Sequence, residues 1–281
     1  MVIGAVSGGP GAPAAGAHEH LPGERTAAAR AAEVLWHELE CGCYRADLPL
    51  WRELADREGG PILDIGAGTG RVSTVLADAG HEVVAVDVDE TLLGALEERA
   101  AAVKVQAVCT DARALALDRR DFGLCIVPMQ TIQLLGGRPG RLAFLRGARA
   151  HLRRGGVLAC AIAAALEPFD CARGDPAPIP DSMRVDGVLY VSRPTRVQVH
   201  RDSVLIERER LLVALADDAW GAAGGSAGPV QAVERSVIEL DRLSPRQLQR
   251  EATEVGLRPE PTRQIPASEE HTGSAVVMLR A

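Results

Sequence analysis

The chain has 281 residues, 47% of them hydrophobic and 25% charged, so it can bury a large core of ordinary globular composition. Its formal net charge of -7 excludes a general attraction to nucleic acid or anionic lipid, and we expect neither nucleic acid nor a membrane as a partner. No stretch reaches the roughly 18 apolar residues of a membrane span and no signal peptide is recognisable, so a cytoplasmic location is expected.

The cysteines predict neither disulfides nor a metal site. Cys109, Cys125 and Cys160 lie in apolar runs that are typical of buried strands, where a thiol behaves as a small hydrophobe. Cys41 and Cys43 form a C-x-C pair, but no second cluster of Cys or His stands at zinc-ligand spacing. We therefore interpret this pair as free thiols at a helix end and expect no metal.

Two segments precede the predicted catalytic core. Residues 1–23 are rich in Gly, Ala and Pro with little to bury, and are expected to form a disordered tail. Residues 24–58 show apolar positions at spacings of three and four, followed by a short helix around 48–57. We call residues 24–58 the N-terminal cover.

Residues 59–165 alternate between strands and helices, which predicts parallel crossovers. The strands are near-continuous apolar runs, as expected of a parallel sheet covered on both faces. The expected strands are 61–65, 82–86, 103–109, 123–128 and 157–162, and the expected helices are 71–79, 90–101 and 141–152.

The alternation of strands and helices stops in residues 166–242, which we interpret as a β-rich insertion or lid. Alternating patterns predict strands at 188–199, 203–213 and 230–240, with a turn at Arg201-Asp202 and a mobile loop at 217–229.

Residues 243–281 then complete the core sheet. We expect a helix at 244–255, capped by Ser244 and ended by Gly256, and two last strands at 257–264 and 273–279. The predicted fold is α/β, with a doubly wound, mostly parallel seven-stranded sheet and an antiparallel β insertion after the fifth strand.

A glycine loop follows the first core strand, in Asp64-Ile65-Gly66-Ala67-Gly68-Thr69-Gly70. Glycine at a strand-to-helix turn lets a ligand approach the backbone closely, which predicts a nucleoside-bearing ligand. A nicotinamide dinucleotide site would have a third glycine at position 71, where Arg71 stands, and an acid precedes the loop. The pattern therefore favours a different adenosine ligand.

This D-x-G-x-G-x-G segment after a strand resembles motif I of the class I S-adenosylmethionine-dependent methyltransferases. The resemblance covers residues 44–162 well and 244–279 more loosely, while the insertion matches nothing specific. It implies S-adenosylmethionine as cofactor, S-adenosylhomocysteine as product and a small-molecule methyl acceptor. The N-P-P-Y type segment of enzymes that methylate DNA bases or protein glutamine is absent.

Downstream acids match the same family. Asp87 ends the second strand about twenty residues after the first glycine, where a carboxylate can accept both ribose hydroxyls. Val88 would lie on the adenine face, and Asp111-Ala112 resembles the family's adenine-edge motif. Tyr44, with Asp47 and Trp51, resembles the cover of small-molecule methyltransferases such as the glycine N-methyltransferase-like group. The expected cofactor-binding residues are Tyr44, Asp64, Gly66, Ala67, Gly68, Gly70, Arg71, Asp87, Val88, Asp111, Ala112, Pro128, Met129 and Gln130.

Methyl transfer is a direct displacement that needs alignment and exclusion of water rather than a nucleophilic residue. The catalytic residue is therefore open. Gln130 stands where it could hold the acceptor or a cofactor group. The other candidates, each with a surface, capping or packing role as its alternative, are His37, Tyr44, Asp47, His151 and His271.

The insertion is expected to form a wall of the acceptor pocket, because specificity in this fold resides in additions above the strand ends. Tyr190 and Arg193 are its candidate acceptor contacts; the alternative is an added sheet for contact in a homodimer. The alternating charges of 207–210 are interpreted as a solvated face.

Three functions remain open at this point. The first is methyl transfer from S-adenosylmethionine to an N or O nucleophile of a small molecule. The second is an NAD(P)-dependent oxidoreductase, which shares the early crossover and the ribose acid. The third is a non-catalytic binding protein that keeps the fold.

Overall fold

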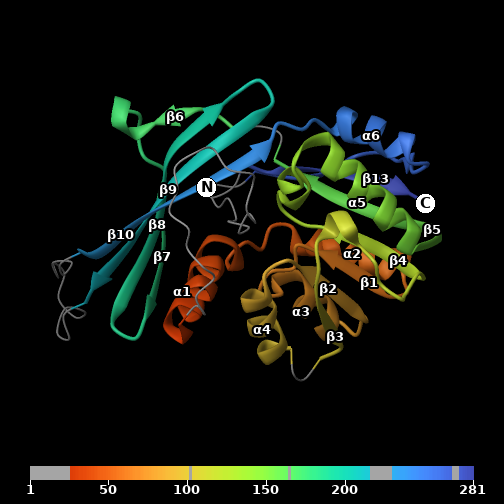
Figure 1. Ribbon diagram of the computed structural model, residues 1–281, viewed down its shortest axis with the longest axis horizontal. Coiled ribbons are helices and arrows are strands. Elements are labelled where there is room, and N and C mark those ends of the chain that lie inside the picture. Colours follow the sequence, from red (N-terminus) through yellow and green to blue (C-terminus); the bar gives the residue numbers. More distant parts are fainter. Residues whose placement is uncertain (1–25, 101–102, 164–165, 216–229, 268–271) are drawn as a thin grey trace, which may run out of the picture.

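Two β-sheets organise the chain (Figure 1). The computed structural model describes residues 26–100, 103–163, 166–215, 230–267 and 272–281. The predicted tail, the predicted loop at 217–229 and His271 lie outside the described residues.

The central sheet has eight strands, and five of them are the predicted parallel ones. The order is β11-β13-β5-β4-β1-β2-β3, with β12 also paired to β13. The chain order reverses between β1 and β4, so the carboxyl ends of these two strands flank the position where doubly wound sheets bind ligands. The parallel strands are β1 (Ile62–Ile65), β2 (Val83–Asp87), β3 (Val105–Cys109), β4 (Phe122–Val127) and β5 (Leu152–Ile162).

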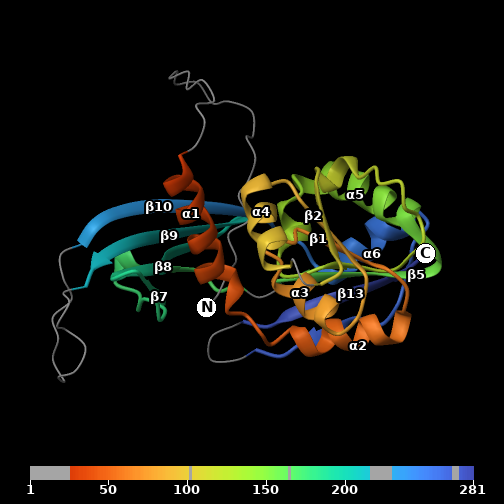
Figure 2. The same cartoon turned by 90° about the horizontal axis from the view of Figure 1, so that it is seen from below.

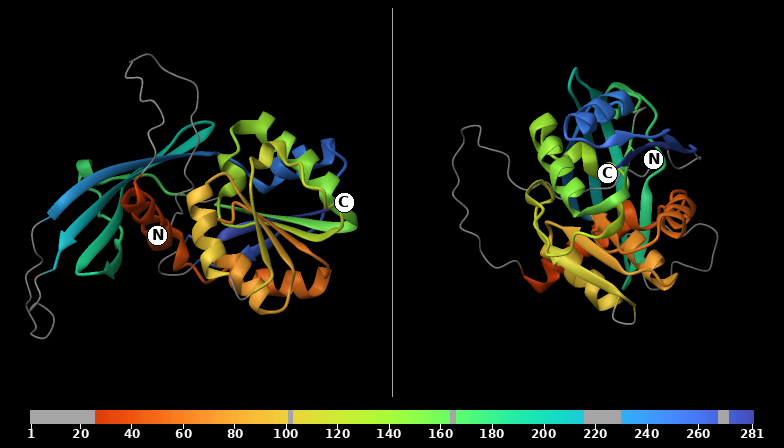
Figure 3. Two further views of the ribbon diagram at one scale, coloured as in Figure 1. Left: turned by 60° about the horizontal axis from the view of Figure 1, so that its bottom comes forward. Right: turned by 90° about the vertical axis from the view of Figure 1, so that its right-hand side faces the viewer.

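Helices cover both faces of this sheet (Figure 3). Alternate residues of a strand point to opposite faces, so Ile62 packs with the α2 and α3 side while Leu63 packs with the α5 and α6 side. The covering helices are α2 (Leu48–Glu58), α3 (Arg71–Asp78) and α4 (Glu90–Arg99) on one face, and α5 (Gly137–His151) and α6 (Pro245–Glu254) on the other.

The C-terminal segment differs from the prediction in one respect. The strand expected at 257–264 is two short pieces, β11 (Arg258–Pro259) and β12 (Arg263–Ile265), which both pair with β13 (Ser274–Arg280). Pro259 and Pro261 have no N–H to donate to a ladder, which explains the interruption. The expected count of seven strands is therefore one short. Ser244 caps α6 by accepting from the Gln247 amide at 3.3 Å, as predicted.

The insertion after β5 is an antiparallel five-stranded sheet. Its long strands β8 (Val188–Val199), β9 (Ser203–Ala214) and β10 (Val230–Asp241) confirm the three predicted strands. The short strands β6 (Phe169–Asp170) and β7 (Asp181–Val185) were not predicted, because they are brief and flank a proline-rich stretch.

The helix α1 (Ala27–His37) lies between the two sheets and continues as the π-turn η1 (Glu38–Gly42) (Figures 1 and 2). The described residues also include three short 3-10 turns: η2 (Ala112–Ala114), η3 (Thr131–Leu134) and η4 (Cys171–Arg173). In the described part of the chain, no helix combines the length and apolar character needed to cross a bilayer.

Burial of the cysteines follows strand position. Cys125 on β4 and Cys160 on β5 are buried as predicted. The prediction for Cys109 was wrong: it is exposed, because β3 is the edge strand of the sheet. Cys41 is buried and Cys43 exposed, and neither forms a disulfide with another described cysteine.

Candidate functional site

The glycine loop joins β1 to α3 and is held close to its neighbours. The amides of Gly66 and Ala67 both donate to the carbonyl of Val86, at 2.8 and 3.1 Å. Gly66 has φ 71°, and a Cβ added there would lie 2.5 Å from the side chain of Thr131. A larger residue is therefore excluded both by conformation and by the approach of the β4 loop.

Asp64 precedes the loop and is almost completely buried, at 1% exposure. The hydroxyl of Ser73 donates to its Oδ2 at 2.6 Å, whereas its Oδ1 has no hydrogen-bond partner among the described residues. Burial raises the pKa of Asp64 to about 6. A buried carboxyl oxygen without a partner is costly unless a ligand satisfies it.

Asp87 ends β2 and braces the loop. Its Oδ2 accepts from the Gly68 amide at 2.8 Å, and its Oδ1 accepts from the Asp89 amide at 3.0 Å. Burial raises the pKa of this carboxyl. The next residue, Val88, leaves 48% of its surface exposed beyond the strand end.

Asp111 follows β3, so the three acids stand at the carboxyl ends of neighbouring strands. Its carboxylate accepts from the backbone and the guanidinium of Arg113, at 2.8 Å from the amide. Hydrogen bonds from Arg113 lower the pKa of Asp111, which stays ionised. Ala112 beside it is buried.

The segment that follows β4 faces the glycine loop. Pro128 and Met129 follow the strand, and Met129 has φ 55°, which is uncommon outside glycine. Gln130 is 8% exposed and begins the η3 turn. The turn at Met129 brings the nearby Thr131 next to Gly66 of the glycine loop.

Arg71 occupies the position of the missing third glycine and is itself buried. Its guanidinium makes a bidentate pair with Asp47, at 2.6 and 2.7 Å, and donates to the carbonyl of Tyr44 at 2.7 Å. The Tyr44 ring lies 5.2 Å from the same guanidinium. Arg71 thus ties the N-terminal cover to the start of α3.

A cavity of about 30 Å³ lies beside the glycine loop. The cavity lining does not include the other predicted cofactor-binding residues, which are Tyr44, Gly68, Gly70, Asp87, Val88, Asp111 and Ala112. Its lining residues are His37, Cys41, Asp64, Gly66, Ala67, Arg71, Val72, Pro128, Met129, Gln130 and Thr131.

Comparison with known proteins identifies the core. A family model described as a methyltransferase domain matches residues 62–156. Residues 62–156 thus form a methyltransferase domain.

The cypemycin N-terminal methyltransferase of a Streptomyces species is 38% identical over 100 residues, which are 36% of this chain and 40% of that protein. The match thus spans less than half the length of this relative.

Solved structures share the whole architecture of the methyltransferase domain and its insertion. CalS10, an amino pentose methyltransferase from Micromonospora echinaspora, has a TM-score of 0.63 and 19% identity, over 94% of this chain and 100% of that chain. The sugar N-methyltransferase KedS8 from Streptoalloteichus has a TM-score of 0.66 and 16% identity, over 98% and 100% of the two chains. At this identity the likeness establishes the fold.

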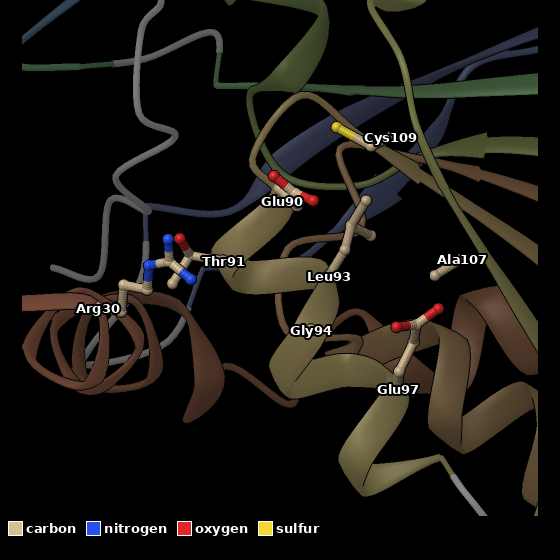
Figure 4. A pocket seen from close by; sticks show the side chains of 8 residues that line it. All are labelled: Arg30, Glu90, Thr91, Leu93, Gly94, Glu97, Ala107 and Cys109. Atoms are coloured by element: carbon tan, nitrogen blue, oxygen red, sulfur yellow. The ribbon is translucent and has the colours of Figure 1, made fainter. Parts of the chain in front are cut away.

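A larger hollow of about 590 Å³ is lined by residues of α4 and β3 together with Arg30 of α1 (Figure 4). It borders the loop after β2, because the Cys109 thiol donates to the Val88 carbonyl at 3.6 Å. None of the predicted site residues lines it. Its lining residues are Arg30, Glu90, Thr91, Leu93, Gly94, Glu97, Ala107 and Cys109.

The residues considered as candidate bases differ in their surroundings. His37 lines the small cavity, and burial lowers its pKa, although Asp87 and Glu38 oppose this effect. His151 is 1% exposed and bonded to the Gly147 carbonyl and the Leu117 amide, at 2.7 and 2.9 Å, so its role is structural. Asp47 is fully engaged by Arg71 and by the Trp51 indole at 2.8 Å. These contacts favour the structural alternative for both His151 and Asp47.

One of the two acceptor-facing predictions in the insertion also needs correction. Tyr190 faces the cover, where its ring meets that of Trp36 edge-on at 5.1 Å. Arg193 is three residues further along the strand and points to the opposite face, where it pairs with Glu209 at 2.8 Å. Arg193 therefore cannot line the same pocket as Tyr190.

The sequence reasoning missed a buried charge cluster between the insertion and the cover. Arg210 makes a bidentate pair with Glu40 at 2.8 and 2.9 Å, and the Ser192 hydroxyl donates to Glu40 at 2.7 Å. Arg208, 1% exposed, donates to Ser192 and Asp181. The prediction of a solvated face for 207–210 holds for Glu207 and Glu209 but is wrong for the two arginines.

Gln133 was also missed. Its side-chain carbonyl accepts from the Ala163 amide at 2.8 Å, and its amide group donates to the Asp241 carbonyl at 3.0 Å. Gln133 is 2% exposed and joins the β4 loop to the ends of β5 and β10. A glutamine three residues after Gln130 gave no signal of this role in the sequence.

Proposed function

We propose that this protein is an S-adenosylmethionine-dependent methyltransferase that methylates an N or O nucleophile of a small molecule. The observation that carries the proposal is the buried Asp64 oxygen without a described partner, at the end of β1 beside a bare glycine backbone. A cationic group of an adenosine ligand would satisfy that oxygen. The order of Asp64, Asp87 and Asp111 on adjacent strands supports the same ligand.

The residues present fit this cofactor. Asp87 would accept from the ribose hydroxyls, and Val88 and Asp111 would meet the adenine. Asp64 and the Gly66 backbone would hold the amino-acid end, opposite Pro128, Met129 and Gln130. When bound, S-adenosylmethionine supplies a methyl group activated by a sulfonium charge, and S-adenosylhomocysteine is the product.

The protein's own task is then alignment and exclusion of water. Residues of its cover lie against the cavity beside the strand ends, and Gln130 is a polar side chain there that could orient an acceptor. No nucleophilic residue is needed, and an amine acceptor has only to arrive unprotonated.

We propose nitrogen as the attacking atom. The cypemycin, CalS10 and KedS8 proteins are named for an N-terminal, an amino pentose and a sugar N acceptor, respectively. Amino sugars and peptide N-termini are therefore the first acceptors to test. A cytoplasmic location stays a prediction, as does a homodimer, for which the edge strand β10 with exposed Val233 and Val237 is the surface to test.

Calorimetric titration with S-adenosylhomocysteine tests the cofactor. We expect micromolar binding, with no heat from NAD⁺ or NADP⁺ under the same conditions. Binding of the nicotinamide cofactor instead would support the oxidoreductase alternative and overturn the proposal. Release of S-adenosylhomocysteine in the presence of an amine library would separate an enzyme from a non-catalytic binding protein.

A further inference from the structure

The part of the proposed cofactor site that adjoins Asp64 and Gly66 is almost filled in this structure. The cavity at the glycine loop measures about 30 Å³, whereas small-molecule pockets commonly measure about 300 to 1,000 Å³. The N-terminal cover contributes His37 and Cys41 to its lining, opposite the residues of the methyltransferase domain. A nucleoside ligand can enter only if one of these sides moves.

His37 fills the space above the loop. A Cβ added to Gly68 would lie 2.4 Å from Cε1 and Nε2 of the His37 ring, so the imidazole rests directly on the glycine backbone. This is the backbone that the proposed cofactor must approach.

Two neighbouring residues of the cover are fastened to the loop through Thr69. The Thr69 hydroxyl lies 3.2 Å from His37 Nδ1 and donates to the Glu38 carboxylate. A carboxylate can only accept, so the single hydroxyl proton points to Glu38 and the Thr69 oxygen accepts from His37 Nδ1–H. The neutral imidazole then carries its lone pair on Nε2, above Gly68.

Arg99 at the end of α4 completes this contact. It donates to Glu38 at 3.0 Å and to the Thr69 carbonyl at 3.2 Å. We call His37, Glu38, Thr69 and Arg99 the latch. Glu38 and Arg99 are partly exposed, with 24% and 42% of their side-chain surface accessible, so water competes for this ion pair.

The other side of the cover is fastened more firmly. Glu40 is fully buried between Arg210 and Ser192 of the insertion, and Trp36 packs against Tyr190. Breaking that cluster would leave a buried charge without its partner. When α1 and η1 move, they therefore leave the glycine loop and stay on the antiparallel sheet, while Asp47 remains paired with Arg71.

We infer that the latch holds the cofactor site closed in the free protein, and that the cofactor enters when α1 and η1 swing away from Thr69 together with the antiparallel sheet. This inference rests on the proposed function, because it assumes that the ligand of the loop is S-adenosylmethionine. Stabilising the closed form lowers the fraction of molecules that can bind the cofactor, and this slows the observed association.

The test is stopped-flow fluorescence of S-adenosylhomocysteine binding, with Trp36 as reporter because it directly precedes His37. The latch variants are Arg99→Met and Thr69→Val. The matched control is Thr74→Val, which removes a hydroxyl that donates to the carbonyl of Gly70, the residue before α3, at 2.8 Å rather than to the cover. We expect association about 3- to 10-fold faster in both latch variants, the range for losing one hydrogen bond of the closed form, and no change in the control.

Hydrogen exchange of the free protein gives a second readout. Amides of residues 35–42 should exchange faster in Arg99→Met than in the wild type, without any ligand. Wild-type association and exchange in both latch variants would overturn the latch. If no variant, including the wild type, binds S-adenosylhomocysteine, the proposed function fails and the cofactor gate fails with it.

Discussion

Arg71 and Asp47 form a buried bidentate ion pair that joins the first residue of α3 to the residue before α2. The side chains are 6% and 1% exposed, and Asp47 also accepts from the Trp51 indole. Arg71 stands where a dinucleotide-binding motif would have its third glycine, and here it binds the N-terminal cover.

Asp47→Ala should lower the free energy of unfolding by about 3 to 5 kcal/mol, because it leaves the buried Arg71 charge without its partner. Urea denaturation followed by circular dichroism measures the change. Asp56→Ala is the control, since Asp56 pairs with His81 at 3.0 Å but leaves 74% of its side chain exposed. That change should stay within about 0.5 kcal/mol. Equal losses in the two variants would contradict the importance of the buried pair.

Asp87→Ala should weaken S-adenosylhomocysteine binding by about 1.5 to 3 kcal/mol, the cost of losing a charged hydrogen-bond acceptor. Calorimetry measures the affinity, and the thermal unfolding midpoint shows whether the variant is folded. Asp78→Ala, at the exposed end of α3, is the control for an acid remote from the loop. An unchanged affinity in a folded Asp87 variant would mean that this carboxyl does not hold the cofactor.

Much of the architecture follows from local patterns. Near-continuous apolar runs such as 122–127 are typical of strands buried on both faces, and the D-x-G-x-G-x-G segment is typical of the turn between such a strand and a helix. The predictions of the parallel strands, the long antiparallel strands and the Ser244 cap therefore hold.

The predictions that failed concerned residues whose surroundings are formed by segments distant in the sequence. Alternation along β9 predicts two different faces, but not that Arg208 and Arg210 would be covered by Glu40, about 170 residues earlier in the chain. Likewise, nothing local reveals that His37 rests on Gly68, or that β3 is the edge strand that exposes Cys109. Edge position and covering partners are properties of the assembled fold.

The Asp64 carboxyl should make the stability of the free protein depend on pH. Its pKa is raised from 3.8 to about 6, so folding favours the protonated form, and this contribution is full below about pH 4 and lost as pH rises through about 6. The difference between the two pKa values corresponds to about 3 kcal/mol. Asp64→Asn should therefore be more stable than the wild type at pH 7.5, by about 2 to 3 kcal/mol, and nearly equal to it at pH 4.

Urea denaturation of both proteins at the two pH values checks this, and the same Asn variant should bind S-adenosylhomocysteine more weakly. Ser73→Ala serves as a control, because it removes the hydrogen bond that Ser73 donates to Asp64 Oδ2. The side-chain oxygen of the Asp64→Asn variant can still accept that bond. A wild type and an Asn variant with parallel pH profiles would show that the native carboxyl titrates normally.

Arg210 and Arg193 lie on opposite faces of the antiparallel sheet, which makes them a matched pair of substitutions. Arg210→Met should lower the free energy of unfolding by about 3 to 5 kcal/mol, because Glu40 would remain fully buried without its bidentate partner. Arg193→Met removes a pair with Glu209 on the outer face, where 45% of the arginine side chain is exposed, and should change stability by less than about 1 kcal/mol. Chemical denaturation compares the two. Trp36 fluorescence should also shift in Arg210→Met alone, since Arg210 lies 5.4 Å from that ring. A tolerant Arg210 would mean that the cover is not held on the sheet by this cluster.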